Sequence, residues 1–291
     1  MLARTLALLG MSVALVLAAC GPSGGSSKAT VAFEVRAPVG EKADAAALEL
    51  VKTALTERLK EFKPALIGVQ VNATGDAVLV ELRAEPKPEQ IAALEARVET
   101  SGAFAILPVV QPDSLEPGAA DQRETMLEWR AAHPEGTAAQ FNATPPELGG
   151  PLPTFRWFSY RQAPERWLCC DVTGLASPAT RFTESDLDPA GLRRGLDKVG
   201  YPCIHAEPLP ARAAHLLALT TQWVDGQVAC VLGEELLTAP FLNSALGGSF
   251  PLEDRFTELE RDALLDVLRA AALHGRLPFK PVLKRVMPTT K

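Results

Sequence analysis

The stretch VAFEVR at residues 31–36 alternates apolar and polar side chains, which is the period of a half-buried β-strand. The next segment carries apolar residues three and four positions apart, which places them on one face of a helix. These helix residues are Leu48, Val51, Leu55, Leu59 and Phe62. The chain is therefore expected to open with a strand followed by an amphipathic helix.

Strand-like alternation returns at residues 67–71 and again at 78–82, separated by a short polar turn. Pro88 then stands where a second helix would begin, a position at which its missing N–H costs nothing. The apolar run at residues 104–110 indicates a fourth strand. This β-α-β-β-α-β order predicts a ferredoxin-like base over residues 30–110.

Residues 111–165 are rich in proline and in aromatic side chains, with few periodic apolar positions. We expect a long irregular connection here, with a short helix around residues 121–132. Large rings stabilise a compact connection when they are buried, and they form a docking patch when they are exposed. Both interpretations stay open for the aromatic residues at the end of this region. The candidates for polypeptide docking are Phe155, Trp157, Phe158, Tyr160 and Trp167.

Regular patterns resume at residues 166–280, where we expect a second, mixed α+β head subdomain. Strand-like and helix-like segments alternate along it, and Thr183-Glu184-Ser185-Asp186 supplies polar caps for a helix that begins at Leu187. The expected strands are 167–172, 202–206 and 227–232, and the expected helices are 187–199, 211–224 and 252–274. Residues 281–291 are expected to be a basic tail, and the fold class is α+β.

The chain begins like an export signal. Arg4 is followed by an apolar run from Thr5 to Ala19, and small residues stand just before Cys20. This arrangement is typical of a secretory signal, and the cysteine makes it similar to a bacterial lipoprotein signal. We expect residues 1–19 to be cleaved and Cys20 to receive the lipid that anchors the chain in a bilayer. An uncleaved anchor is the alternative, although fifteen residues are short for a span.

Residues 20–29 are rich in glycine and serine, which is typical of a flexible tether. We expect a protein of the cell envelope that faces the periplasm or the exterior. Gly21 stands where aspartate is associated with retention in the inner membrane of enteric bacteria, so the outer membrane is favoured.

Composition predicts a folded core and excludes some partners. Hydrophobic residues make up 47% of the chain and charged residues 22%, enough apolar surface to bury. The formal net charge is −6, and loss of Arg4 with the signal makes it −7. Nucleic acid and anionic lipid both require a basic face, so neither is expected as a partner.

No pattern indicates catalysis. The four histidines lack metal-ligand spacing, no C-x-x-C is present, and no nucleophile stands beside a base in the sequence. We expect no enzyme activity, no catalytic, cofactor or metal site, and no small-molecule substrate. Four cysteines remain after Cys20, which allows three pairings; buried thiols or one structural bridge are both consistent with them.

The second half carries several short segments in succession, at 182–187 (FTESDL), 202–204 (PCI), 219–221 (LTT), 226–232 (GQVACVL), 239–242 (APFL), 246–248 (LGG) and 265–278. Their order and spacing resemble the head region of the SecD family of export proteins. Upstream, residues 59–82 resemble the part of the family that precedes the head. Departures are Glu184, where the family has glycine, and Gly233, where aspartate is common.

The resemblance implies a head-and-base module that contacts unfolded polypeptide at the Sec translocon and carries no catalytic residues. We expect the chain to lack the family's six membrane helices and thus its use of the proton gradient. In the head sheet we expect the strands of Cys203 and Cys230 to be neighbours, so these two residues are candidates for a disulfide. The competing hypothesis is an envelope scaffold that keeps the fold without binding clients.

Overall fold

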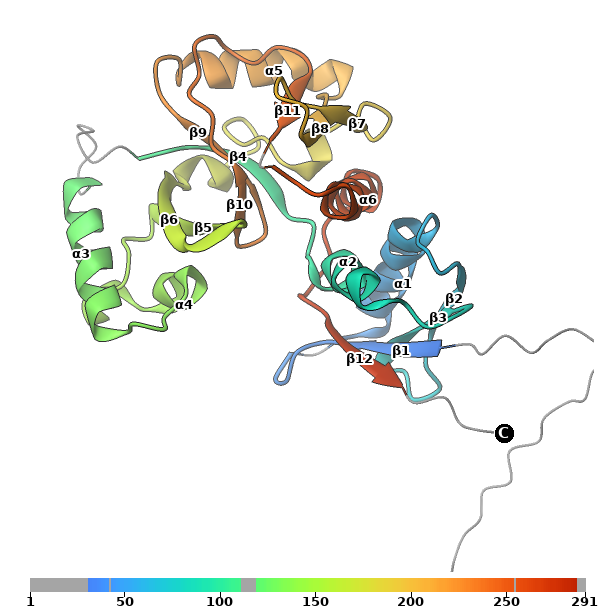
Figure 1. Ribbon diagram of the computed structural model, residues 1–291. Coiled ribbons are helices and arrows are strands. Elements are labelled where there is room, and N and C mark those ends of the chain that lie inside the picture. Colours follow the sequence, from blue (N-terminus) through green and yellow to red (C-terminus); the bar gives the residue numbers. More distant parts are fainter. Residues whose placement is uncertain (1–30, 42, 111–118, 254, 287–291) are drawn as a thin grey trace, which may run out of the picture.

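Four antiparallel strands and two helices form the first lobe, which we call the base (Figure 1). The computed structural model describes residues 31–41, 43–110, 119–253 and 255–286. The sheet order is β12-β1-β3-β2. The elements are β1 (Val31–Arg36), α1 (Ala45–Leu59), β2 (Leu66–Val71), β3 (Ala77–Leu82), α2 (Pro88–Glu99) and β12 (Val282–Val286).

The base is closed by the end of the chain and not by the predicted fourth strand. β12 pairs antiparallel with β1 from Val286 opposite Ala32 to Val282 opposite Arg36. The expectation of a basic tail at residues 281–291 is thus wrong for this strand. Its basic residues face solvent at a sheet edge, where charge is common, so the charge concealed the strand pattern. The boundary at residue 110 is wrong as well, because the base needs both ends of the chain.

The predicted fourth strand exists as β4 (Phe104–Pro108), but it belongs to the second lobe, the head. There it is one edge of a five-stranded sheet with the order β4-β9-β10-β5-β6, in which only the β10–β5 pair is parallel. The other strands are β5 (Phe155–Tyr160), β6 (Ala163–Asp171), β9 (Val228–Leu232) and β10 (Glu235–Thr238).

A smaller sheet with the order β11-β8-β7 completes the head. Its strands are β7 (Arg193–Leu196), β8 (Pro202–Ala206) and β11 (Phe250–Leu252), and the head helices are α3 (Ala119–Ala132), α4 (Ala138–Ala143) and α5 (Pro210–Thr221). Three single 3-10 turns also occur, at η1 (Pro146–Leu148), η2 (Thr173–Ala176) and η3 (Glu184–Asp186). The α+β class is therefore confirmed.

Two head segments differ from expectation. The helix predicted at 187–199 is absent: the caps at Thr183 start only the turn η3, and the chain then extends into β7. Pro189 and Gly191 disfavour a helix here, which explains the error. In the connection predicted at 111–165, α3 confirms the helix expected around residues 121–132, but α4, β5 and the start of β6 were not expected, so a boundary at residue 165 would cut a strand.

Helix α6 (Glu258–His274) lies between the lobes and contacts elements of both. Its side toward the head buries Leu264, Leu265 and Leu268 in the largest apolar cluster. Its side toward the base carries Asp266, which forms a buried ion pair with Arg97 of α2 at 2.8 Å. Burial raises the pKa of Asp266 even though the Arg97 charge opposes this shift.

The crossing from base to head passes a fully buried arginine. Arg58 of α1 donates from Nη1 to the carbonyl oxygens of Arg97 at 2.8 Å and Thr100 at 2.6 Å. Burial lowers the pKa of this guanidinium to about 9. The returning chain lies alongside, because Leu277 N donates to Ser101 O at 2.7 Å. Arg58 therefore caps the C-terminal end of α2, at the place where the segment that leads into the head and the segment that returns from it lie side by side.

Candidate functional site

The five aromatic residues proposed for docking do not form one exposed patch. Phe155 and Trp157 point from β5 into a buried cluster with α3 and α4, whereas Phe158 faces the opposite, equally buried side of the sheet. For these three residues the docking interpretation is wrong and the core interpretation is correct. Tyr160 and Trp167 are half-buried.

Arginines cover the rings of the two half-buried aromatics. The guanidinium carbon of Arg130 lies 4.6 Å from the centre of the Trp167 ring, and that of Arg166 lies 4.8 Å from the Tyr160 ring. Trp167 Nε1 also donates to Pro164 O at 3.0 Å. Because the rings are already engaged, neither offers a bare apolar surface to a ligand.

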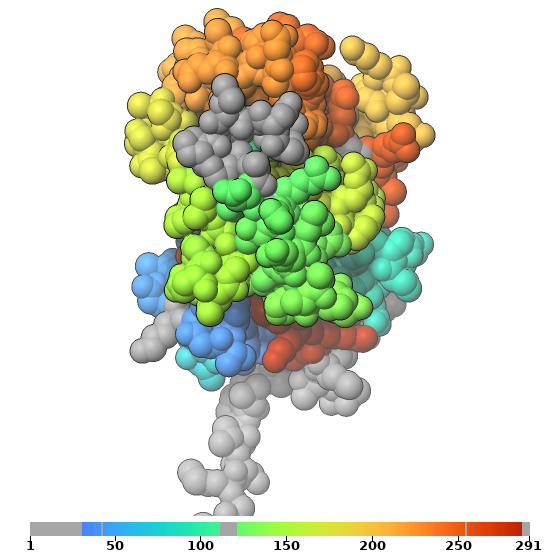
Figure 2. All heavy atoms as spheres, turned by 90° about the vertical axis from the view of Figure 1, so that its left-hand side faces the viewer, coloured from blue at the N-terminus to red at the C-terminus, as the bar shows by residue number. Residues whose placement is uncertain are grey.

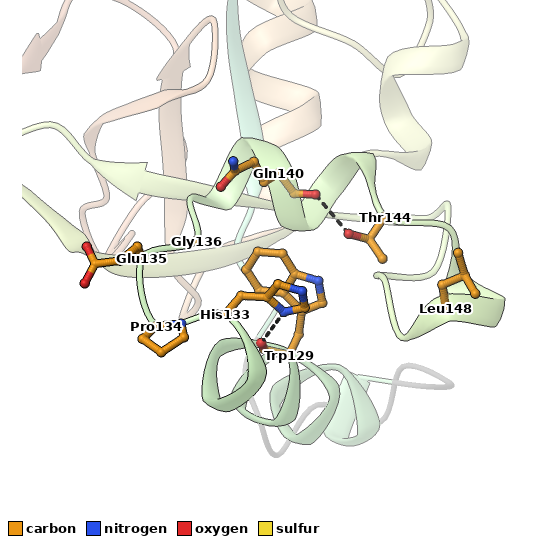
Figure 3. A pocket seen from close by; sticks show the side chains of 8 residues that line it. All are labelled: Trp129, His133, Pro134, Glu135, Gly136, Gln140, Thr144 and Leu148. Atoms are coloured by element: carbon orange, nitrogen blue, oxygen red, sulfur yellow. Dashed lines mark hydrogen bonds between the residues drawn. The ribbon is translucent and has the colours of Figure 1, made fainter.

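An open groove lies beside this cluster, between the loop after α3 and the α4–η1 segment, with a volume of about 630 Å³. Trp129 lies at its base, and the His133 ring stacks on it with centroids 4.3 Å apart and planes 18° apart (Figure 3). His133 Nδ1 lies 2.9 Å from Trp129 O, which fixes the imidazole over the indole. The remaining lining residues are Pro134, Glu135, Gly136, Gln140, Thr144 and Leu148.

Close backbone approach shapes the groove. A Cβ on Gly136 would lie 2.5 Å from the Trp129 ring, so only glycine fits there. On the far wall Thr144 Oγ1 donates to Gln140 O at 3.0 Å, and Leu148 stands 71% exposed at the rim. Figure 2 shows that α3 and α4, in green, form the middle of the face that carries the groove.

Side-chain amides fix this layer to the sheet. Asn142 of α4 donates from Nδ2 to Trp157 O at 2.7 Å and accepts from Trp157 N at 2.9 Å. The buried Gln122 of α3 accepts from Leu152 N at 3.1 Å. Both helices are therefore held in register, and the groove between them has a defined shape.

Sequence reasoning missed this groove. It singled out the aromatics at 155–167, whereas the groove is lined by loop residues such as His133, Pro134 and Leu148, which follow no periodic pattern. The available signal was the Pro-Glu-Gly turn at 134–136 directly after a tryptophan-bearing helix.

The predicted Cys203–Cys230 bridge is wrong. β8 and β9 belong to different sheets, and both thiols are free and buried. Burial raises the pKa of Cys230 to about 12 and also raises that of Cys203, so neither is an activated nucleophile. Within the described residues, no cluster of three His, Cys, Asp or Glu side chains has the geometry to hold a metal ion. The proposed lipidation site, Cys20, lies outside the described residues.

The α+β fold of this chain is similar to that of solved SecDF structures. A crystal structure of SecDF in a super-membrane-facing form aligns with 89% of this chain at 19% identity and a TM-score of 0.55. The alignment spans 30% of that SecDF chain, so this protein corresponds to less than a third of it.

A second structure, from work on SecDF as a membrane component that enhances protein export, aligns over 88% of this chain and 98% of its own length. Its identity is 18% and its TM-score 0.54. At such identities the likeness concerns the fold. No family model matches the chain, and neither does any curated protein. Among the described helices, none combines the length and apolarity needed to span a bilayer.

Proposed function

We propose that this chain is a lipid-anchored, non-enzymatic component of the cell envelope that assists protein export, either by binding unfolded polypeptide or by docking on the Sec translocation machinery. The observation that carries the proposal is the fold match, which spans almost the whole of a SecDF fragment and therefore includes both lobes. The lipobox-like Leu17-Ala18-Ala19-Cys20 supports export and attachment to a membrane, with the outer membrane favoured over the inner.

The α3–α4 groove supplies a surface suited to polypeptide. The His133 imidazole, which is stacked on the buried Trp129, and the exposed Leu148 can accept apolar side chains of many shapes, while Glu135 and Gln140 at the walls can bond to a passing backbone. An extended client needs no defined sequence for such contacts. A groove open at its sides also lets a long chain lie across it.

Binding of a denatured, reduced polypeptide to residues 21–291, measured by fluorescence anisotropy, tests the proposal. This fragment retains every described residue. Leu148→Asp places a charge at the groove rim and should weaken binding about tenfold. Leu273→Asp, at an exposed position of α6, is the matched control and should bind normally. Equal affinity of all three proteins would exclude the groove, and absence of binding would exclude client capture.

A scaffold role is the second candidate, and the burial of Phe155, Trp157 and Phe158 favours it, because the aromatics most suited to clients lie in the core. Affinity capture separates the two roles. A scaffold retains folded envelope partners in the presence of excess denatured polypeptide, whereas a client-binding protein releases bound chains under that competition.

A further inference from the structure

The groove between α3 and α4 has an exposed carboxylate near each of its ends. Figure 3 places Glu135 at one end and Leu148 at the other, with the His133 ring between them. Glu147 precedes Leu148 in the η1 turn and is exposed as well. A ligand that lies along the groove therefore meets acidic side chains on both sides of the stacked ring.

Neither carboxylate is neutralised by its surroundings. Among the described residues, no ion pair and no side-chain hydrogen bond involves the carboxylate of Glu135 or Glu147. An ionised carboxylate accepts hydrogen bonds only, so both groups can accept from an incoming ammonium or guanidinium group. The ends of the groove are thus suited to cations supplied by a ligand.

The basic side chains nearby are engaged elsewhere. Arg130 is the only arginine or lysine among residues 129–150, which form the groove, and its guanidinium lies over the Trp167 ring. On the adjoining strand β5, Arg156 forms an ion pair with Glu234 at 2.5 Å. Two carboxylates against one guanidinium leave the groove segment with a net charge of −1, so it attracts basic side chains and repels acidic ones.

Apolar surface lies between the two charged ends. The His133 ring and Pro134 are exposed, and the ring is held in place by its stacking on the buried Trp129. Leu148 adds an aliphatic side chain that is 71% exposed. Apolar side chains pack on such a surface, and the flat face of a guanidinium group stacks on an aromatic ring.

We propose that the α3–α4 groove selects unfolded segments in which an apolar stretch is flanked by lysine or arginine. This inference rests on the proposed binding of unfolded polypeptide. The apolar stretch lies against His133 and Leu148, and the flanking cations pair with Glu135 and Glu147. The preference concerns charge and not a defined sequence, so many different clients satisfy it. A segment with acidic flanks meets like charges and binds more weakly.

Fluorescence anisotropy with three labelled peptides tests this preference. The peptides share one apolar core and carry lysine, glutamine or glutamate at both ends. In low salt, residues 21–291 should bind the lysine peptide about fivefold more tightly than the glutamine peptide, because two exposed ion pairs form. The glutamate peptide should bind most weakly. High salt should remove these differences, because it screens exposed charges.

Two charge variants show whether the preference arises in the groove. Glu135→Gln combined with Glu147→Gln should make the lysine and glutamine peptides bind alike. The matched control combines Glu41→Gln with Glu89→Gln, which removes the same charge from exposed positions of the base and should keep the fivefold preference. A preference that persists in the groove variant, or that is lost equally in the control, would overturn the proposal.

The glutamine peptide separates this inference from the proposed function. If it binds and lysine ends add no affinity, the binding of unfolded polypeptide stands and the charge preference is rejected. If none of the three peptides binds, the proposed polypeptide binding fails, and the preference fails with it.

Discussion

Gly102 lies where the chain passes from the base to the head, and its replacement by alanine should destabilise the protein. Its φ of +84° lies in the left-handed region that alanine rarely adopts. A Cβ there would lie 2.9 Å from Arg58 Nη2 and 3.0 Å from Ala271 Cβ. Neither neighbour can move freely, since Arg58 is bound to carbonyl oxygens and Ala271 is part of α6.

The magnitude follows from two contributions. The left-handed backbone costs alanine about 1–2 kcal/mol, and forcing a methyl group into a packed junction costs about 1–3 kcal/mol more. Gly102→Ala should therefore lower the free energy of unfolding by about 2–5 kcal/mol. Only the second contribution depends on the contact between the lobes.

Two other glycines isolate that second contribution. Gly75 has a φ of +68° and Gly149 of +83°, and a Cβ at either would meet nothing within 4 Å. Their alanine variants should lose only about 1–2 kcal/mol. Urea unfolding followed by circular dichroism gives all three values. A loss at Gly102 no greater than at Gly75 and Gly149 would refute the tight junction described here.

Three more outcomes are expected. Burial raises the pKa of Glu184, so its contribution to stability is full at acid pH and is lost as the pH rises through the folded-state pKa. The stability of Glu184→Gln, measured by denaturant titration, should therefore increase relative to that of the parent between acid and neutral pH. Parallel pH profiles of the two proteins would contradict this. Asn142→Ala removes the hydrogen bonds to the backbone N–H and C=O of Trp157, which should lower the free energy of unfolding by about 1–3 kcal/mol and change the near-ultraviolet circular dichroism of the tryptophan cluster. An unchanged spectrum and an unchanged stability would show that these hydrogen bonds do not hold α4 on β5. A chain ending before β12 at Val282 should unfold at lower urea concentration and bind a hydrophobic dye, whereas a chain that lacks only residues 287–291 should not.

The local part of the fold was predictable from the sequence because periodicity reports burial of nearby residues. The strand at 31–36 and the helix that follows it appear where their apolar spacing places them. Pairing partners were not predictable in the same way. β1 pairs with a strand about 250 residues further along the chain, and no pattern within residues 31–36 identifies that partner strand.

The same limit applies to the groove. Trp129 was visible as an aromatic residue, but its position at the base of the groove depends on Gly136 lying against the ring and on Asn142 fixing α4 to β5. Both are single polar or small residues in short segments, and their roles arise only from tertiary contact. The buried aromatics of β5 show the converse: composition alone does not separate a docking ring from a core ring.

The order of the chain has a consequence for how the two lobes depend on each other. The base sheet is closed by β12, which is made last, and the base core contains Leu277 and Phe279 from the same returning segment. Residues 30–110 on their own would therefore expose the β1 edge and part of their apolar core. The head is an insertion within the base, and α6, whose apolar side lies in the head core, also packs on α1 and α2 of the base. These contacts along α6, together with the buried Arg97–Asp266 ion pair, hold the head and the base together as one unit.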